Sequence, residues 1–150
     1  MTGAVLPSES IILNLSIHHD GHEETRRMEF DELSNRVIGC ALTVHRELGP
    51  GLLETVYEQC LAHELQLNGI AFESQCPQRV EYKGVRLDCG YRIDLLIEGR
   101  LIVELESIDR IKGIHEAQLL TYMRLAGVKT GLLMNFNVTR LKDGLKRFVL

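Results

Sequence analysis

The sequence predicts an α/β fold with a mixed sheet flanked by helices, and two observations carry this prediction. Apolar residues recur every three or four positions between residues 31 and 67, the period of amphipathic helices, and then alternate every second position between residues 79 and 107, the period of strands. A further helical segment at residues 114–127 separates these strands from another apolar run at residues 130–136. Strands interrupted by a helix in this way are typical of a sheet with helices packed on its faces.

The first helix begins near Asp31, where Asp31 or Ser34 provides a cap. Its predicted buried stripe consists of Leu33, Val37, Cys40 or Ala41, Val44 and Leu48. The segment "LGPG" ends the helix, because Gly49 suits a left-handed backbone and Pro50 cannot continue a helix.

The second helix is predicted at residues 52–67 and ends at Asn68-Gly69. Its predicted inward-facing residues are Leu53, Val56, Tyr57, Leu61 and Leu65.

Three strands follow within residues 79–107, with turns at Lys83-Gly84 and Glu98-Gly99. The helix at residues 114–127 comes next and directs Leu119, Leu120 and Met123 toward the core. The run at residues 130–136 is predicted as a buried strand, and "LKDGLKRFVL" as a turn with a final edge strand. The predicted order is therefore α, α, β, β, β, α, β, β.

Residues 1–27 differ from this pattern and are predicted to be an extension, either mobile or adding an edge strand, before a single domain at residues 28–150. The extension contains His18, His19 and His22, but no cysteine or further histidine stands at ligand spacing, which disfavours a metal site there.

Composition indicates a globular, cytoplasmic protein. The 150 residues fit one domain, no apolar run approaches the ~20 residues of a membrane span, and no secretory signal is recognisable. The four cysteines show no CxxC pair, so each is interpreted as structural.

The net charge of −4 is unevenly distributed. Residues 108–150 contain eight basic and three acidic residues, whereas residues 1–107 contain nine basic and eighteen acidic ones. A basic C-terminal third suits contact with phosphate while an acidic part holds metal, although a merely solvated surface explains the charge equally well.

Three acids indicate a possible catalytic site. Glu104 and Glu106 in "IVELES" stand two positions apart, so they share one face of a strand. The turn at Glu98-Gly99 brings Asp94 beside that strand. An exposed strand face is the simpler explanation, but such a group of carboxylates also suits Mg²⁺ or Mn²⁺.

The helix after these strands has His115, Gln118 and Tyr122 on one face, because they are spaced by three and then four residues. Alone, this face is explained as a half-exposed polar stripe. Its position directly after the three acids makes it a candidate part of the same site.

Several separated motifs resemble one known family. "GLLETVY" matches the signature of the GxxExxY protein family, and "YKGVRLDCGYRIDLLIEGRLIVELES", "IHEAQLLTYMRLAG" and "GLLMNFNVTRLKDGLKRFVL" resemble the rest of it. The resemblance covers residues 28–150. This family is placed in the PD-(D/E)xK nuclease-like superfamily, so the resemblance implies a restriction-endonuclease-like α-β-β-β-α-β core.

The resemblance also implies roles for individual residues. Asp94 matches the aspartate of the PD motif and Glu104 the acid of the (D/E)xK motif. Gln118 and Tyr122 match a QxxxY helix found in exonuclease-like branches. Glu54 resembles an early-helix acid, so the implied metal ligands are Glu54, Asp94 and Glu104.

Position 106 departs from the superfamily, because Glu106 stands where the resemblance calls for a lysine that orients the attacking water. Lys112, or alternatively Arg92, is a candidate replacement cation, although an ordinary solvated lysine is the simpler explanation of Lys112. Glu106 itself is a candidate additional metal ligand.

The resemblance therefore implies a Mg²⁺- or Mn²⁺-dependent nuclease acting on nucleic acid, on DNA rather than RNA, as a possible homodimer and with activity impaired by Glu106. The alternative is an inactive nuclease fold that serves as a nucleic-acid-binding or protein-interaction module.

Overall fold

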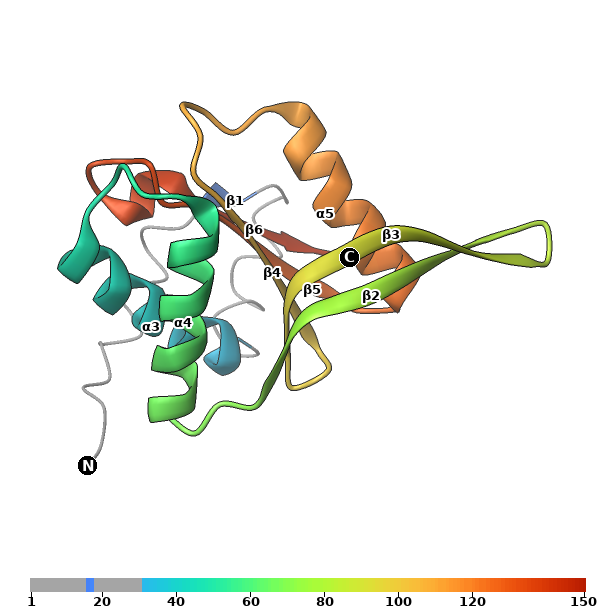
Figure 1. Ribbon diagram of the computed structural model, residues 1–150, viewed down its shortest axis with the longest axis horizontal. Helices are drawn as coiled ribbons and strands as arrows, with labels where there is room; N and C mark the ends of the chain where they lie inside the picture. The colour runs from blue at the N-terminus through green and yellow to red at the C-terminus, as the bar shows by residue number, and fades with distance from the viewer. Residues whose placement is uncertain (1–15, 18–30) are drawn as a thin grey trace.

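The structure, a computed structural model, describes residues 16–17 and 31–150 and shows a mixed sheet with helices on both faces (Figure 1). Its elements are β1 (Ser16–Ile17), α3 (Glu32–Leu48), α4 (Glu54–Leu67), β2 (Phe72–Tyr82), β3 (Val85–Ile97), β4 (Leu101–Glu106), α5 (Gly113–Ala126), β5 (Thr130–Asn135), the 3₁₀ helix η1 (Leu141–Gly144) and β6 (Leu145–Val149). The strands lie in the order β1-β6-β5-β4-β3-β2.

The sheet is mixed because α5 connects β4 to β5, which run parallel, while β2, β3 and β4 form antiparallel hairpins. The predicted α/β class and restriction-endonuclease-like core are confirmed. One detail differs: β6 is not an edge strand, because β1 pairs with it in parallel on the side away from β5. The predicted mobility of the extension and its three histidines lie outside the described residues.

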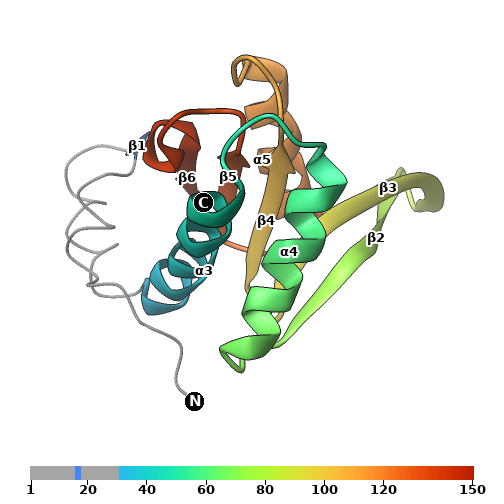
Figure 2. The same cartoon turned by 60° about the vertical axis from the view of Figure 1, so that its left-hand side comes forward.

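Helices α3 and α4 cover one face of the sheet, and α5 covers the other (Figures 1 and 2). The α3/α4-side core contains stripe residues of both helices together with Leu95, Val103 and Leu132 of the central strands. The α5-side core contains Leu119 and Met123 packed on the opposite face of the same strands. Leu120 is only partly buried against that second core. No helix in the described residues is long and apolar enough to cross a membrane.

The residue predicted to cap α3 occupies the capping position but makes a different contact from the expected one. Asp31 occupies the capping position, but its side chain makes no capping hydrogen bond and instead forms a buried ion pair with Arg147 of β6. Gly49 ends the helix at a φ of 68°, as expected. The ion pair fastens the start of α3 to β6.

Helix α4 begins at Glu54, two residues later than predicted, and this moves its buried stripe. Tyr57, Leu61 and Leu65, each four residues apart, are fully buried, whereas Leu53 is 74% exposed and Val56 37%. The prediction that Leu53 and Val56 face inward is therefore wrong. Residue 53 precedes the helix, and residue 56 lies beside the stripe rather than on it.

Tyr57 fixes α4 against the sheet. Its ring stacks on Phe136 with ring centroids 4.6 Å apart, and its hydroxyl donates to the Gly49 carbonyl at 2.5 Å. The Leu52 backbone N–H donates to the same hydroxyl at 3.1 Å. Because the loop before α4 is tied to this buried ring, the first turn of α4 is held over the end of β4.

β2 begins at Phe72, seven residues before the predicted start, and pairs with β3 along its whole length. The two strands continue beyond the sheet as a projecting hairpin (Figure 1). Its tip turn, Lys83-Gly84, has positive φ at both residues, 48° and 82°, and so does the turn at Glu98-Gly99. Both predicted turns are therefore present: Lys83-Gly84 joins the paired residues Tyr82 and Val85 as a two-residue turn, whereas three residues separate the paired residues Ile97 and Leu101.

Candidate active site

The carboxylates of Asp94 and Glu104 meet at the point where β3 and β4 separate. The last backbone pair between these strands is Leu95 with Val103. Beyond it, the Asp94 backbone N–H donates to Glu104 Oε2 at 2.8 Å, and the Leu105 backbone N–H donates to Asp94 Oδ2 at 2.9 Å. The two side chains thus take the place of the ladder hydrogen bonds, and each strand contributes one acid.

An irregularity in β3 accompanies this exchange. Ile93 and Leu95 are two residues apart and would share a face of a regular strand, yet Ile93 belongs to the α5-side core and Leu95 to the α3/α4-side core. The backbone therefore changes orientation at Asp94, which is held between the two strands. Glu104 is only 8% exposed.

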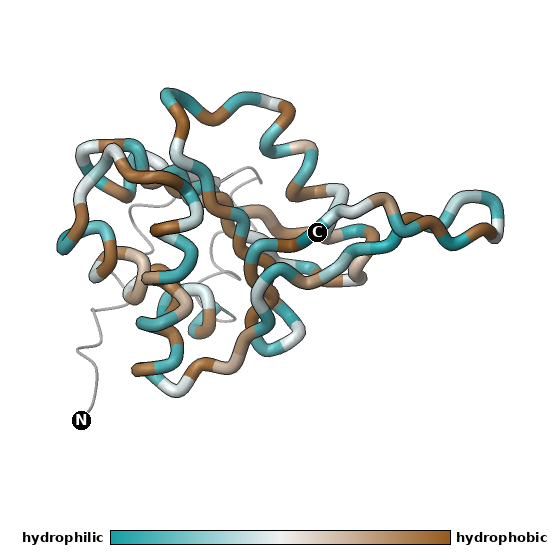
Figure 3. The backbone as a smooth tube through the Cα atoms, in the orientation of Figure 1, coloured by the Kyte–Doolittle hydropathy of each residue, from teal (hydrophilic) through white to brown (hydrophobic). Residues whose placement is uncertain are grey.

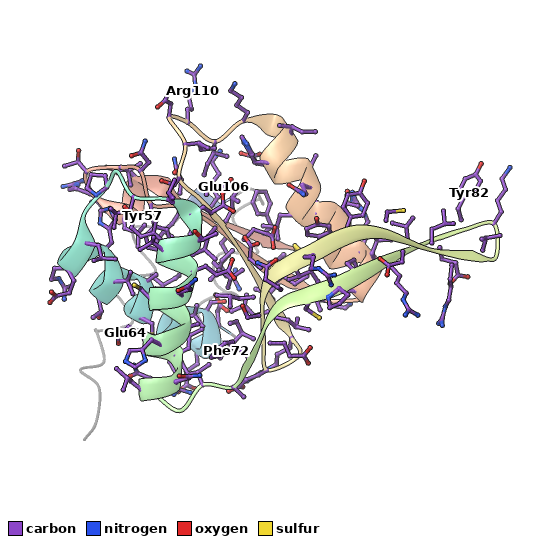
Figure 4. The ribbon with its side chains drawn as sticks, in the orientation of Figure 1. Tyr57, Glu64, Phe72, Tyr82, Glu106 and Arg110 are labelled. Atoms are coloured by element: carbon purple, nitrogen blue, oxygen red, sulfur yellow. The ribbon has the colours of Figure 1, made fainter. Side chains whose placement is uncertain are left out.

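Helix α4 adds Glu54 and Glu58, which are one turn apart and share a face. The carboxyl of Glu54 hydrogen-bonds to that of Glu106. Glu106 lies at the end of β4 (Figure 4). We call Glu54, Glu58, Asp94, Glu104 and Glu106 the acidic cluster. Helix α4 and the two consecutive strands β3 and β4 contribute to it.

Gln75 links two members of the acidic cluster. Its amide donates to both oxygens of Glu58 at 2.9 and 3.0 Å, and to Asp94 Oδ1 at 3.2 Å. Ser74 also donates to Glu58, at 3.1 Å. Sequence reasoning missed Glu58 and Gln75, although the four-residue spacing from Glu54 would have indicated Glu58.

The surroundings of the acidic cluster do not stabilise the ionised form of all its carboxyl groups, so several of their pKa values are raised. Burial, followed by the charge of Asp94, raises the pKa of Glu104 to about 9. Burial also raises the pKa of Asp94 to about 6, against the opposing effect of the Leu105 N–H. Burial and the Glu106 charge raise the pKa of Glu54 to about 7. Buried carboxylates with pKa values raised in this way mark a site that binds cations or performs proton chemistry.

The chemistry of these donors fits a hard divalent cation, since Mg²⁺ and Mn²⁺ prefer carboxylate oxygens. In the described part of the chain, no three His, Cys, Asp or Glu side chains already converge as a preformed metal site. Asp94 and Glu104 instead use one oxygen each to accept a backbone N–H. Each oxygen has a second lone pair, so this hydrogen bonding is compatible with metal ligation.

Helix α5 brings Tyr122 to the acidic cluster. Tyr122 is 4% exposed, and its hydroxyl accepts a hydrogen bond from the exposed Gln118 side chain at 3.0 Å. Burial raises the pKa of Tyr122, and the charges of Glu104 and Asp94 raise it further. The structure therefore brings Tyr122 together with Asp94 and Glu104, and Gln118 contacts Tyr122 from the exposed side.

No candidate replacement for the expected lysine forms an ion pair with the acidic cluster among the residues described. Lys112 and Arg92 are both exposed. His115 does act on the acidic cluster. Its positive charge lowers the pKa of Glu106, although burial raises that pKa by more. The Lys112 backbone N–H donates to His115 Nδ1 at 2.9 Å, so in the neutral ring the proton resides on Nε2.

The basic C-terminal third is partly neutralised within the fold. Lys146 pairs with Glu116, Arg147 with Asp31, and Arg140 with Asp143 at 3.7 Å. These pairs leave less free positive charge on the last strand than the sequence suggests.

The raised pKa values predict that the acidic cluster destabilises the metal-free protein at high pH. A group whose pKa is higher in the folded state contributes stability below its unfolded pKa, and this contribution is lost as the pH rises through the folded value. Glu104→Gln should therefore raise the melting temperature in chelator at pH 8 by roughly 3–10 °C, with little change at pH 5. Differential scanning fluorimetry from pH 5 to pH 9 measures this.

The matched control is Glu47→Gln, which removes the same charge from an exposed position on α3. It should leave the melting curve almost unchanged at every pH. An equal shift of the melting temperature in both variants, or a Glu104→Gln shift that does not grow with pH, would contradict the conclusion that the acidic cluster destabilises the metal-free protein at high pH.

Comparison with known proteins gives one match. The family model of the PD-(D/E)XK nuclease superfamily matches residues 31–148 of this chain. Neither the comparison with curated proteins nor the comparison with solved structures gives a match.

Proposed function

Because the chain belongs to the PD-(D/E)XK nuclease superfamily, we propose that it is a divalent-metal-dependent phosphodiesterase that cleaves nucleic acid, DNA in preference to RNA, at the acidic cluster. The observation that carries the proposal is the meeting of Asp94 and Glu104 between two separating strands. Neither carboxylate has a cationic side chain paired with it in the described residues, and the pKa of each is raised. A bound cation would supply the missing positive charge.

Glu54, Asp94 and Glu104 are the residues that would hold Mg²⁺ or Mn²⁺. When bound, such an ion lowers the pKa of a coordinated water and neutralises charge that develops on the phosphate. Two neighbouring side chains position Asp94: the amide of Gln75 donates to it, and Glu58 holds Gln75. The Leu105 N–H fixes the second oxygen of Asp94.

Tyr122 and Gln118 are proposed to contact the substrate. The Tyr122 hydroxyl lies near Asp94 and Glu104, whose charges act on it, and Gln118 donates to it from the exposed side. A hydroxyl and an amide at this place offer hydrogen-bond donors to a phosphate oxygen beside the acids. They add no charge, so they orient the phosphate rather than neutralise it.

Glu106 is expected to make this activity slow. It places a carboxylate where a cation would stabilise charge building on the phosphate, and loss of one such donor costs about 10²–10³ in rate. His115 is the group of α5 whose charge acts on Glu106, and it compensates only in part.

A second candidate function rests on the same Glu106. The hydrogen bond between Glu106 and Glu54 holds these two members of the acidic cluster together without a bound cation. A protein that has lost catalysis would still present the fold and the acidic cluster, as a module that binds nucleic acid or protein.

The experiment combines metal-dependent melting with cleavage. At pH 8, Mg²⁺ or Mn²⁺ should raise the melting temperature of the wild type by a few degrees, with about 100-fold excess over Kd corresponding to about 2.7 kcal/mol. At pH 5 the shift should disappear, because protons then compete for the same carboxylates. Labelled single-stranded DNA, duplex DNA and RNA are incubated in parallel, with chelator as control.

Slow cleavage that requires the metal and stops in chelator supports the enzyme. A metal-dependent melting shift without cleavage of any polynucleotide supports the binding module instead. The absence of any shift at pH 8 would remove the metal site from the proposal.

A further inference from the structure

The β2–β3 hairpin extends beyond the sheet as an arm, which we define as residues 78–92. β3 pairs with β4 only at residues 95–97, so the strands of the arm pair only with each other. Every residue from 81 to 92 is exposed. The arm projects away from all three helices (Figure 1). At ~3.3 Å per residue it is about 20 Å long.

One face of the arm is apolar. Tyr82 pairs with Val85, and Val80 with Leu87, and these cross-strand pairs alternate with the charged pair Glu81 and Arg86. Cross-strand partners point to the same face, and so do residues two positions apart on one strand. The four apolar side chains therefore form one surface. Tyr82 is 60% exposed, Val85 56% and Leu87 41%. Figure 3 shows that hydrophobic residues continue along the arm beyond the sheet.

The arm is also positively charged within an acidic protein. It contains four basic residues and two acidic ones: Arg79, Lys83, Arg86 and Arg92 against Glu81 and Asp88. None of the four cations forms an ion pair within the part of the chain that the structure describes. Lys83 Nζ lies 5.3 Å from the centroid of the Tyr82 ring, so an aromatic ring and a cation share the tip (Figure 4).

The arm is continuous with the acidic cluster. At its base, the ring of Tyr91 contacts that of Tyr122 edge-on, with centroids 6.1 Å apart. Arg92 stands two residues before Asp94 on the same strand. A chain bound along the arm would therefore be led toward the candidate catalytic acids.

These features favour an anionic partner with exposed flat rings. Apolar surface with tyrosine rings accepts unstacked bases, while nearby cations accept phosphates, which is the combination found in single-strand binding surfaces. A duplex keeps its bases stacked inside, so it would leave the apolar face uncovered. Single-stranded nucleic acid uses both properties of the arm.

A second copy of this chain fits less well. Packing two arms together brings two net charges of +2 into contact. The outer edge of β2 is also unsuited to pairing, because Pro77 lacks an N–H donor, Gln75 has a φ of 53°, and the register shifts between Gln78 and Val80.

We propose that the arm binds single-stranded polynucleotide, with bases on the face formed by Val80, Tyr82, Val85 and Leu87, and with the strand's backbone following the edge of the arm to phosphate contacts at Arg79 and Arg86 on the other face. This inference rests on the proposed function, because it assigns the arm to the substrate of the acidic cluster. In this proposal the arm binds the single-stranded polynucleotide, and the acidic cluster cleaves it.

The test measures binding of a short fluorescein-labelled oligothymidylate, and of a duplex of equal length, by fluorescence anisotropy with the full chain in EDTA. Tyr82→Ala should weaken single-strand binding about tenfold. Arg79→Ser combined with Arg86→Ser should reduce the slope of log K against log salt by about 1.4, at about 0.7 for each phosphate contact. All three positions are exposed, so the melting temperature should remain that of the wild type.

The matched control is Arg46→Ser combined with Arg140→Ser, which removes two exposed cations from α3 and from the segment before η1, away from the arm. It should bind like the wild type. The proposal is overturned if the arm variants bind like this control, if the wild type does not bind the single strand, or if it binds duplex equally well. It is also overturned if Tyr82→Ala converts a dimer to a monomer in sedimentation without affecting nucleic acid.

Asp94→Asn distinguishes this inference from the proposed function. In EDTA, adding Tyr82→Ala to this variant should still weaken single-strand binding about tenfold, because Asp94 is not part of the arm. Arm-dependent binding without metal-dependent cleavage would refute the enzyme and retain the binding surface. Metal-dependent cleavage with unaltered binding by the arm variants would refute the binding surface alone.

Discussion

Glu106→Lys should increase the rate of metal-dependent phosphodiester cleavage by about 100-fold. The side chain at position 106 stands at the end of β4, beside the first turn of α4, where its carboxyl shares a hydrogen bond with Glu54. A lysine there would replace this contact between two acids by an ion pair. It would also provide a cation at the edge of the cluster, where negative charge on the phosphate increases during cleavage.

The measurement is single-turnover cleavage of labelled single-stranded DNA with Mn²⁺ at pH 8. Glu106→Gln is the matched control, because it removes the negative charge without adding a positive one, and its rate should lie between those of the wild type and the lysine variant. Equal rates for all three proteins would show that position 106 does not face the reacting phosphate.

Asp94→Asn should reduce cleavage more than 100-fold, since loss of residues that merely support metal ligands costs roughly 10–100-fold. It should also abolish the increase in melting temperature that Mn²⁺ causes at pH 8. Asparagine is chosen over alanine because its amide oxygen can still accept the Leu105 N–H that Asp94 accepts at 2.9 Å. The fold is then kept while the charge is lost.

Asp109→Asn, at an exposed position after β4, removes the same charge and should behave like the wild type in both assays. If Asp94→Asn retains its metal-dependent shift, Asp94 is not a ligand. If it retains cleavage, the reaction takes place elsewhere.

The sequence predicts the central part of this fold well, because period and turn chemistry agree there. The helix from Glu32 to Leu48 buries the residues of the predicted stripe except Leu48, and both predicted turns stand where glycine permits positive φ. Those features are local, so a single sequence is enough to specify them.

The start of β2 could not be predicted from period. Residues 72–78 are mostly polar and include Pro77, a combination that indicates a loop. They form a strand because β3 is available as a partner over its full length. Similarly, the inward orientation assigned to Leu53 failed because the helix begins after it, and a boundary error of two residues is enough to change which side chains are buried.

Within the candidate site, spacing identified the strand acids but not their supports. Glu104 and Glu106 follow from alternation along β4, and Asp94 from the turn that brings β3 beside β4, although the alternation of β3 breaks at Asp94. Tyr122 lies beside the strand acids as the helix pattern suggested. Glu58 shares a helix face with Glu54, whereas Gln75 enters only through tertiary structure, since it meets Asp94 across 19 positions of sequence. No local pattern specifies such a contact.

The exchange between Asp94 and Glu104 gives these acids a second reason to persist. Each carboxylate occupies a backbone donor that the diverging strands would otherwise leave unmatched in a dry environment. An apolar replacement would orphan a buried N–H, at a cost of about 1–3 kcal/mol. Selection for a folded chain alone therefore disfavours apolar residues at both positions but accepts an amide, which keeps the acceptor oxygen, so a hydrogen-bonding side chain there identifies the fold rather than turnover.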